Sequence, residues 1–108
     1  MIYELRVYHC AAGRLPALHK RFSHVTLPLW QKHGIEQAGF FTTVVGPSNQ
    51  TLTYLLKWES LAERETKWTA FATDPEWLAA RAASEADGII VERIDNSFLE
   101  PTAYSSVR

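Results

Sequence analysis

The chain has 108 residues, of which 46% are apolar and 21% are charged, and its net charge is -1. This is the length of one globular domain, which we assign to residues 1–108, and the charges form no basic stripe that would neutralise a nucleic-acid backbone. Because no apolar segment is long enough to span a membrane or to act as a signal peptide, we expect a cytoplasmic protein that binds neither nucleic acid nor membranes.

A first strand is predicted at residues 2–9, where the residues of its two faces alternate. One face carries Tyr3, Leu5 and Val7, and the other carries Glu4, Arg6 and Tyr8. Cys10, the only cysteine, follows this strand. Adjacent strand residues point to opposite faces, so His9 cannot readily activate the thiol, and we expect Cys10 to be a buried structural residue rather than a nucleophile.

A helix is predicted to follow Gly13, since Pro16 suits a first helical turn. Its apolar residues repeat at intervals of three and four, at Leu15, Leu18, Phe22, Val25 and Leu29. Pro28 should kink or interrupt this helix because it has no amide hydrogen, and Gly34 should end it.

Two further strands are predicted at residues 37–45 and 51–58, and the short loop between them indicates an antiparallel hairpin. Ser60 and Glu63 form a capping box that opens a helix, with Leu61, Trp68 and Phe71 on its buried side. Asp74 and Pro75 open another helix, which should extend to Gly88, and a last strand is predicted at residues 89–98. The order predicts an α+β fold, a ferredoxin-like four-stranded antiparallel sheet with helices on one face.

The second face of this sheet has no cover within the chain. The strand at residues 51–58 and the strand at residues 89–98 carry apolar side chains on both faces, as strands buried on both sides do. We therefore expect a homodimer, or a higher oligomer, in which two copies pack sheet to sheet.

The candidate ligand-binding residues on the first strand are Glu4, Arg6 and Tyr8, which are predicted on this second face. Lys57 and Glu92 join them if their strands are in phase. Charges between two sheets are costly unless they are paired or hydrated. The group therefore predicts either a polar pocket that holds a small organic or anionic ligand, or a set of cross-strand ion pairs in a filled interface.

The histidines and aromatic residues give weaker indications. His19 and His24 lie five residues apart, without a cysteine pair or a His-Glu-x-x-His pattern, so we predict no metal site and no cofactor. His24 lies where Pro28 deprives its carbonyl of a helical partner, and it is a candidate ligand-binding residue together with His33. Lys32 and His33 also suit the end of a helix as cations facing its dipole. Trp68, Phe71 and Trp77 are interpreted as core rather than as an aromatic cage.

Four separated segments resemble the NIPSNAP family: Tyr3 to Arg6, Pro28 to Gly34, Phe71 to Trp77 and Leu99 to Ser105. The resemblance implies a dimeric α+β barrel in which residues 101–108 reach toward the partner, and a protein whose activity is uncharacterised. It favours a small ligand in a cavity beside the sheet. The alternatives that it leaves open are a cofactor-free monooxygenase-like or haem-related enzyme of the dimeric α+β barrel group, and a protein-interaction module.

Overall fold

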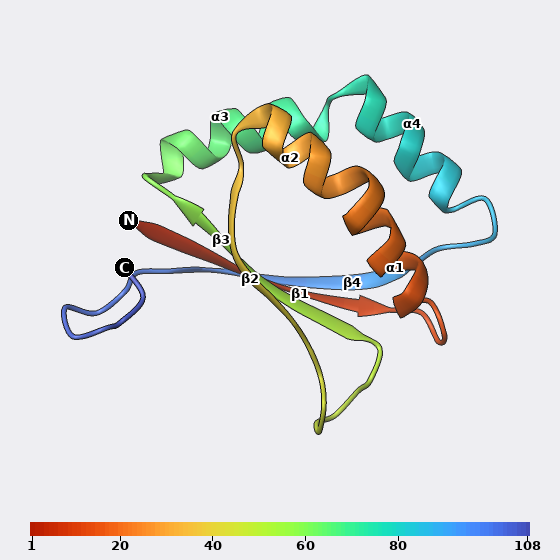
Figure 1. Ribbon diagram of the computed structural model, residues 1–108, viewed down its shortest axis with the longest axis horizontal. Helices are drawn as coiled ribbons and strands as arrows, with labels where there is room; N and C mark the ends of the chain where they lie inside the picture. Colours follow the sequence, from red (N-terminus) through yellow and green to blue (C-terminus); the bar gives the residue numbers. More distant parts are fainter.

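The computed structural model describes residues 1–108 and has two layers, a twisted sheet and a layer of helices on one of its faces (Figure 1). The elements in chain order are β1 (Ile2–Cys10), α1 (Leu15–Arg21), the π-helical turn η1 (Phe22–Thr26), α2 (Leu27–His33), β2 (Glu36–Thr42), β3 (Thr51–Trp58), α3 (Leu61–Ala72), α4 (Pro75–Ser84) and β4 (Val91–Leu99). No helix is both long enough and apolar enough to cross a bilayer.

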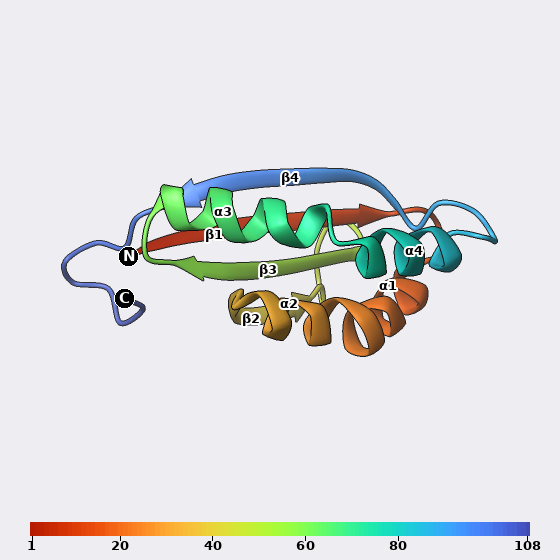
Figure 2. The same cartoon turned by 90° about the horizontal axis from the view of Figure 1, so that it is seen from above.

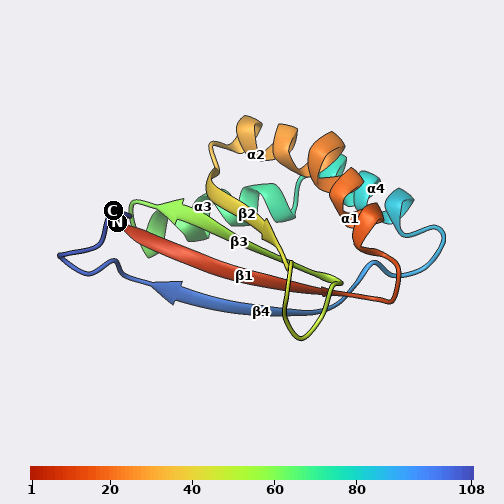
Figure 3. The same ribbon diagram turned by 60° about the horizontal axis from the view of Figure 1, so that its bottom comes forward.

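The sheet has the strand order β2-β3-β1-β4, and each neighbouring pair is antiparallel (Figure 3). Viewed from above, α1 and α2 lie on the β2 side of the sheet, α3 lies along β1, and α4 lies beside α1 near the end of β3 (Figure 2). This is the ferredoxin-like arrangement predicted from the order of elements, and it leaves the opposite face of the sheet without helices.

The first helix is interrupted where Pro28 predicts it. The amide of Leu27 donates to the carbonyl of Phe22, five residues back, so the chain forms one π-helical turn immediately before the proline. The helix then continues as α2 and ends at Gly34, whose φ of 70° is left-handed and favours glycine. The apolar stripe of α1 and α2 is buried against the sheet.

Several predicted boundaries are wrong. The strand β2 ends at Thr42 rather than Val45, because the next residue leaves the ladder and the Thr43 hydroxyl bonds to the Thr51 hydroxyl at 2.9 Å. The helix α4 ends at Ser84, and turns occupy the residues up to Gly88 before β4 begins. Leu61 is 53% exposed rather than buried, since it is the first residue of α3.

The two faces of β3 differ in burial. Leu52, Tyr54, Leu56 and Trp58 face the helices and are buried, as predicted. On the opposite face, Leu55 pairs with Leu5 of β1, and neither side chain is fully buried. The open face of these two strands therefore presents apolar side chains to the outside. The strand β4 lies at the sheet edge, and its Ile94 and Phe98, which pair with Tyr8 and Glu4 of β1, remain partly exposed.

Asp74 joins the end of α2 to the start of α4. Its Oδ1 accepts the amide of Glu76 at 2.8 Å, which caps α4 as predicted. Its Oδ2 accepts from Nζ of Lys32 at 2.9 Å and lies 2.7 Å from Nε2 of His33. These hydrogen bonds hold the pKa of Asp74 well below its ordinary value of 3.8, and the one with His33 contributes most to the lowering.

Asp74→Asn tests this junction. Because the folded state lowers the pKa of Asp74, the ionised carboxylate stabilises the protein above pH 3.8, and the contribution is lost as the pH falls below that value. We expect the variant to melt several degrees below the wild type at pH 7 and the difference to shrink at pH 3, as measured by circular dichroism. A difference in Tm that is equal at both pH values would contradict this role.

Candidate functional site

The side chains of Glu4, Arg6 and Tyr8 lie on the helix-covered face of β1, not on the open face predicted from the sequence. In the antiparallel ladder they are opposite Leu56, Tyr54 and Leu52, the buried residues of β3. The assignment to the open face is wrong because the charges find their partners within the helical layer and on β3. Tyr3, Leu5 and Val7 point to the open face instead.

Glu4 is 0% exposed and is the centre of a buried polar cluster. Its Oε1 accepts from Nε1 of Trp58 at 3.0 Å and from Nε of Arg64 at 3.2 Å. Its Oε2 accepts from Nη2 of Arg64 at 3.1 Å, from Nη1 of Arg6 at 3.0 Å and from Nδ2 of Asn96 at 2.7 Å. Burial by itself raises the pKa of this carboxyl, but the hydrogen bonds and charges of these partners lower it below its ordinary value.

Arg6 connects this cluster to two tyrosines. Its Nε donates to the Tyr54 hydroxyl at 2.8 Å and its Nη2 to the Tyr8 hydroxyl at 3.2 Å. The Tyr54 hydroxyl in turn donates to that of Tyr8 at 2.8 Å. The guanidinium lies over the Trp68 ring, 4.6 Å from its centre, where the ring face attracts a cation. Burial raises the pKa of Tyr54, so it remains a neutral donor.

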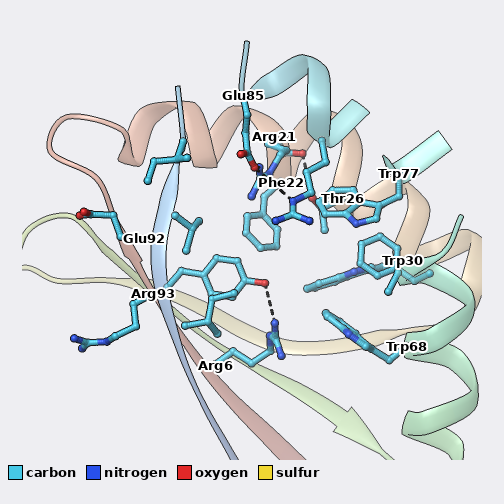
Figure 4. A pocket seen from close by; sticks show the side chains of 17 residues that line it. Arg6, Arg21, Phe22, Thr26, Trp30, Trp68, Trp77, Glu85, Glu92 and Arg93 are labelled. Atoms are coloured by element: carbon cyan, nitrogen blue, oxygen red, sulfur yellow. Dashed lines mark hydrogen bonds and ion pairs between the residues drawn. The ribbon is translucent and has the colours of Figure 1, made fainter. Parts of the chain in front are cut away.

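A cavity of about 490 Å³ lies between the sheet and the helices beside Arg6. Three tryptophans form one side of it, and the residues labelled from β4 form the opposite side (Figure 4). Its lining consists of Arg6, Tyr8, Arg21, Phe22, Thr26, Trp30, Trp68, Phe71, Ala72, Trp77, Arg81, Glu85, Ile89, Val91, Glu92, Arg93 and Ile94. Ten of these seventeen residues are hydrophobic, and four arginines outnumber two glutamates, so the cavity suits an anion with an apolar body.

Two hydrogen-bond donors in this lining have no partner. They are Nε of Arg21 and Nε1 of Trp30, both buried. The Arg21 side chain is held from its other end, where Nη1 donates to Ser84 and Glu85 at 3.3 Å each. Its burial lowers its pKa. A buried donor without an acceptor in the protein is costly, and both of these donors belong to residues that line the one cavity.

The remaining predicted site residues lie elsewhere. Lys57 is on the open face of the sheet, opposite Tyr3 and Glu36. His24 is exposed on the helix surface, and His33 bonds to Asp74 outside the cavity. Glu92 does line the cavity, although its side chain is exposed. The structure has no group of three or more side chains that could hold a metal ion.

Sequence reasoning missed the tryptophans and Arg21 as cavity residues. Trp68 and Trp77 pack partly against the core, as predicted, but they also form the cavity wall. Trp30 is 1% exposed. A signal for Arg21 was present, because it follows Leu18 by three residues and therefore lies beside the buried stripe of its helix.

Solved structures of known proteins share this fold over the whole chain. The protein Atu4242 from Agrobacterium tumefaciens, described as a NIPSNAP family protein with unknown function, is 26% identical in two solved structures, each with a TM-score of 0.87, and the matches cover all of this chain and 100% and 94% of those chains. A NIPSNAP domain protein from Burkholderia xenovorans is 23% identical over 97% of this chain and 98% of its own, with a TM-score of 0.83.

Two more distant structures show likeness in the fold alone. A protein described as a putative antibiotic biosynthesis monooxygenase from Deinococcus radiodurans is 14% identical, with a TM-score of 0.64 over 100% of this chain and 99% of its own. A MhuD variant with two manganese protoporphyrin IX molecules per active site is 20% identical, with a TM-score of 0.58 over 94% of each chain. No curated protein matches the chain in sequence.

The family profile named NIPSNAP matches residues 3–106. These residues include all the helices, all the strands apart from Ile2, and the whole cavity lining. The chain therefore belongs to the NIPSNAP family.

Proposed function

We propose that this NIPSNAP protein binds a small organic anion with a flat apolar body in the cavity between its sheet and its helices. The observation that carries the proposal is the pair of buried, unpartnered donors, Nε of Arg21 and Nε1 of Trp30, in a cavity of about 490 Å³. A carboxylate or similar group could accept from both donors, and its charge would be favoured by that of Arg21.

The charges around the cavity support an anion rather than a cation. The two glutamates of the lining face four arginines, and Glu85 already lies within 3.4 Å of both Arg21 and Arg81. Glu4 is shared between Arg6 and the half-buried Arg64, so these three residues together retain one positive charge. An anion in the cavity would reduce this excess.

The walls support a flat ligand. Trp30, Trp68 and Trp77 are large, rigid surfaces that lose little conformational freedom when they contact a ligand. Haem fits the cavity less well than such an organic anion does, because haem iron needs a protein ligand. The lining has no histidine, cysteine or methionine, and the hydroxyl of its single tyrosine, Tyr8, is already engaged by Arg6 and Tyr54.

We further propose that a second copy of the chain covers the open face of the sheet. This face carries Leu5, Val7 and Leu55 near its centre and Phe41, 57% exposed, near its β2 edge. Contiguous apolar side chains of this kind mark interaction surfaces, and a stable dimer buries more than about 1,000 Å². The tail after β4 leaves Tyr104 89% exposed, which would let residues 101–108 contact the partner.

2-Naphthoate tests the proposed ligand class by isothermal titration calorimetry. We expect it to bind, and 2-naphthalenemethanol, its neutral counterpart, to bind at least about tenfold more weakly because it lacks the charge. Trp30→Phe should weaken naphthoate binding by about tenfold because the substitution removes one donor and keeps an aromatic wall.

Leu29→Val is the matched control. Leu29 adjoins Trp30 on α2 and is also buried, at 3% exposure, but it does not line the cavity. Its substitution should therefore leave the naphthoate affinity within about twofold of the wild type. Equal affinity for the acid and the alcohol, or equal losses in the two variants, would contradict the proposal.

Leu55→Glu tests the proposed dimer. At micromolar concentration, light scattering should give the wild type twice the chain mass of 12.3 kDa, and the variant a single chain mass, because the new charge would be buried in an apolar interface. Leu78→Glu, at a 49% exposed position of α4, should remain a dimer. A wild-type mass of 12.3 kDa would show that the open face has no such partner.

A further inference from the structure

We propose that the Tyr8 hydroxyl, on the sheet side of the cavity (its floor), binds an oxyanion. This hydroxyl would select the ionised form of a bound phenol or enol. This inference rests on the proposed function, since it concerns a second group on the same ligand. The ligand class that it predicts is a flat hydroxy-aromatic or enolic acid, with the acid at Arg21 and Trp30 and the second oxygen at Tyr8.

The hydrogen-bond pattern of Tyr8 leaves one proton free. The phenolic oxygen accepts from Tyr54 at 2.8 Å and from Nη2 of Arg6 at 3.2 Å. Its own hydrogen has no acceptor in the protein, although the side chain is only 8% exposed and lines the cavity. The remaining direction for this donor is therefore toward the cavity, where a ligand oxygen can accept.

The neighbouring arginine determines what kind of oxygen fits. A carboxylate usually binds arginine through two parallel hydrogen bonds along one edge of the guanidinium. In Arg6 each nitrogen already donates: Nε to Tyr54, Nη1 to Glu4 and Nη2 to Tyr8. Three of its five N–H groups are thus engaged, and the edge formed by Nε and Nη2 is occupied by the two tyrosine hydroxyls. A single oxygen that accepts from Tyr8 still gains from the nearby positive charge.

The surrounding charges favour an ionised oxygen at this position. The charged groups that face the cavity are Arg6 from β1, Arg21 from α1, Arg81 and Glu85 from α4 and the turn after it, and Glu92 and Arg93 from β4. Below the floor, the negative charge of Glu4 is shared by Arg6 and Arg64. The positive groups thus outnumber the negative ones around the Tyr8 hydroxyl. When the bound phenol or enol ionises, its O–H bond breaks, the electron pair stays on oxygen and the proton passes to solvent.

The probe is 7-hydroxycoumarin-3-carboxylate, whose phenol and phenolate have different absorption spectra. The wild-type protein should bind it, and the bound phenol should ionise at a pH about one unit or more below that of the free probe, equivalent to a tenfold preference for the phenolate. In Tyr8→Phe the probe should still bind through its carboxylate, but most of this preference should be lost. The methoxy analogue, 7-methoxycoumarin-3-carboxylate, has no ionisable phenol. Its affinity for the wild type should therefore not change over the pH range in which the phenol of the hydroxy probe ionises.

The outcomes separate this inference from the proposed function. If the protein binds 2-naphthoate and the bound coumarin ionises at the same pH as the free one, Tyr8 is not an oxyanion site, while the anion cavity stands. An unchanged preference in folded Tyr8→Phe also overturns the inference. If that variant does not fold, the comparison of hydroxy and methoxy probes on the wild type decides, since equal affinities at a pH where the hydroxy probe is ionised contradict the proposal.

Discussion

The buried carboxylate of Glu4 is the interaction on which the rest of the cavity depends. It binds residues of all the elements that meet at the cavity floor: Arg6 on its own strand, Trp58 on β3, Arg64 on α3 and Asn96 on β4. A charge at 0% exposure is tolerated only with such partners, and removing one partner of a buried ion pair costs on the order of 3–5 kcal/mol. The cluster therefore ties α3 to the three strands β1, β3 and β4.

This arrangement positions Arg6 before any ligand binds. Its guanidinium is held by Glu4, Tyr54 and Tyr8 and lies over the ring of Trp68. A polar group whose position is already determined loses little entropy when a ligand arrives, which favours affinity. On the helical side of the cavity, by contrast, Arg21 and Trp30 each retain a hydrogen-bond donor without a partner. The polar groups on the sheet side thus bond to one another except for one hydroxyl proton, whereas the two donors on the helical side lack acceptors within the protein.

The two faces of the sheet have separate chemistry. The inner face carries the polar cluster and aromatic rings of the cavity lining, including Tyr8, whose ring contacts those of Phe22 and Tyr54. The outer face carries Leu5, Val7 and Leu55 without helical cover. Ligand binding and assembly therefore use opposite sides of the same strands, and a substitution such as that at Leu55 changes one surface without entering the other.

The sequence by itself determined the elements, because their signals are local. The capping residues Ser60 and Asp74, the interruption before Pro28 and the hairpin before Thr51 all lie where the sequence predicts them. Only the tertiary structure decided which face of β1 the helices cover. A shift of one residue exchanges the two faces of a strand, so the local pattern does not decide between them. The partners of Glu4 that decide it are Arg64 and Asn96, which are 60 and 92 residues away in the sequence. The cavity depends on the same long-range contacts, since no local pattern encodes the meeting of Arg6, Trp30 and Trp68.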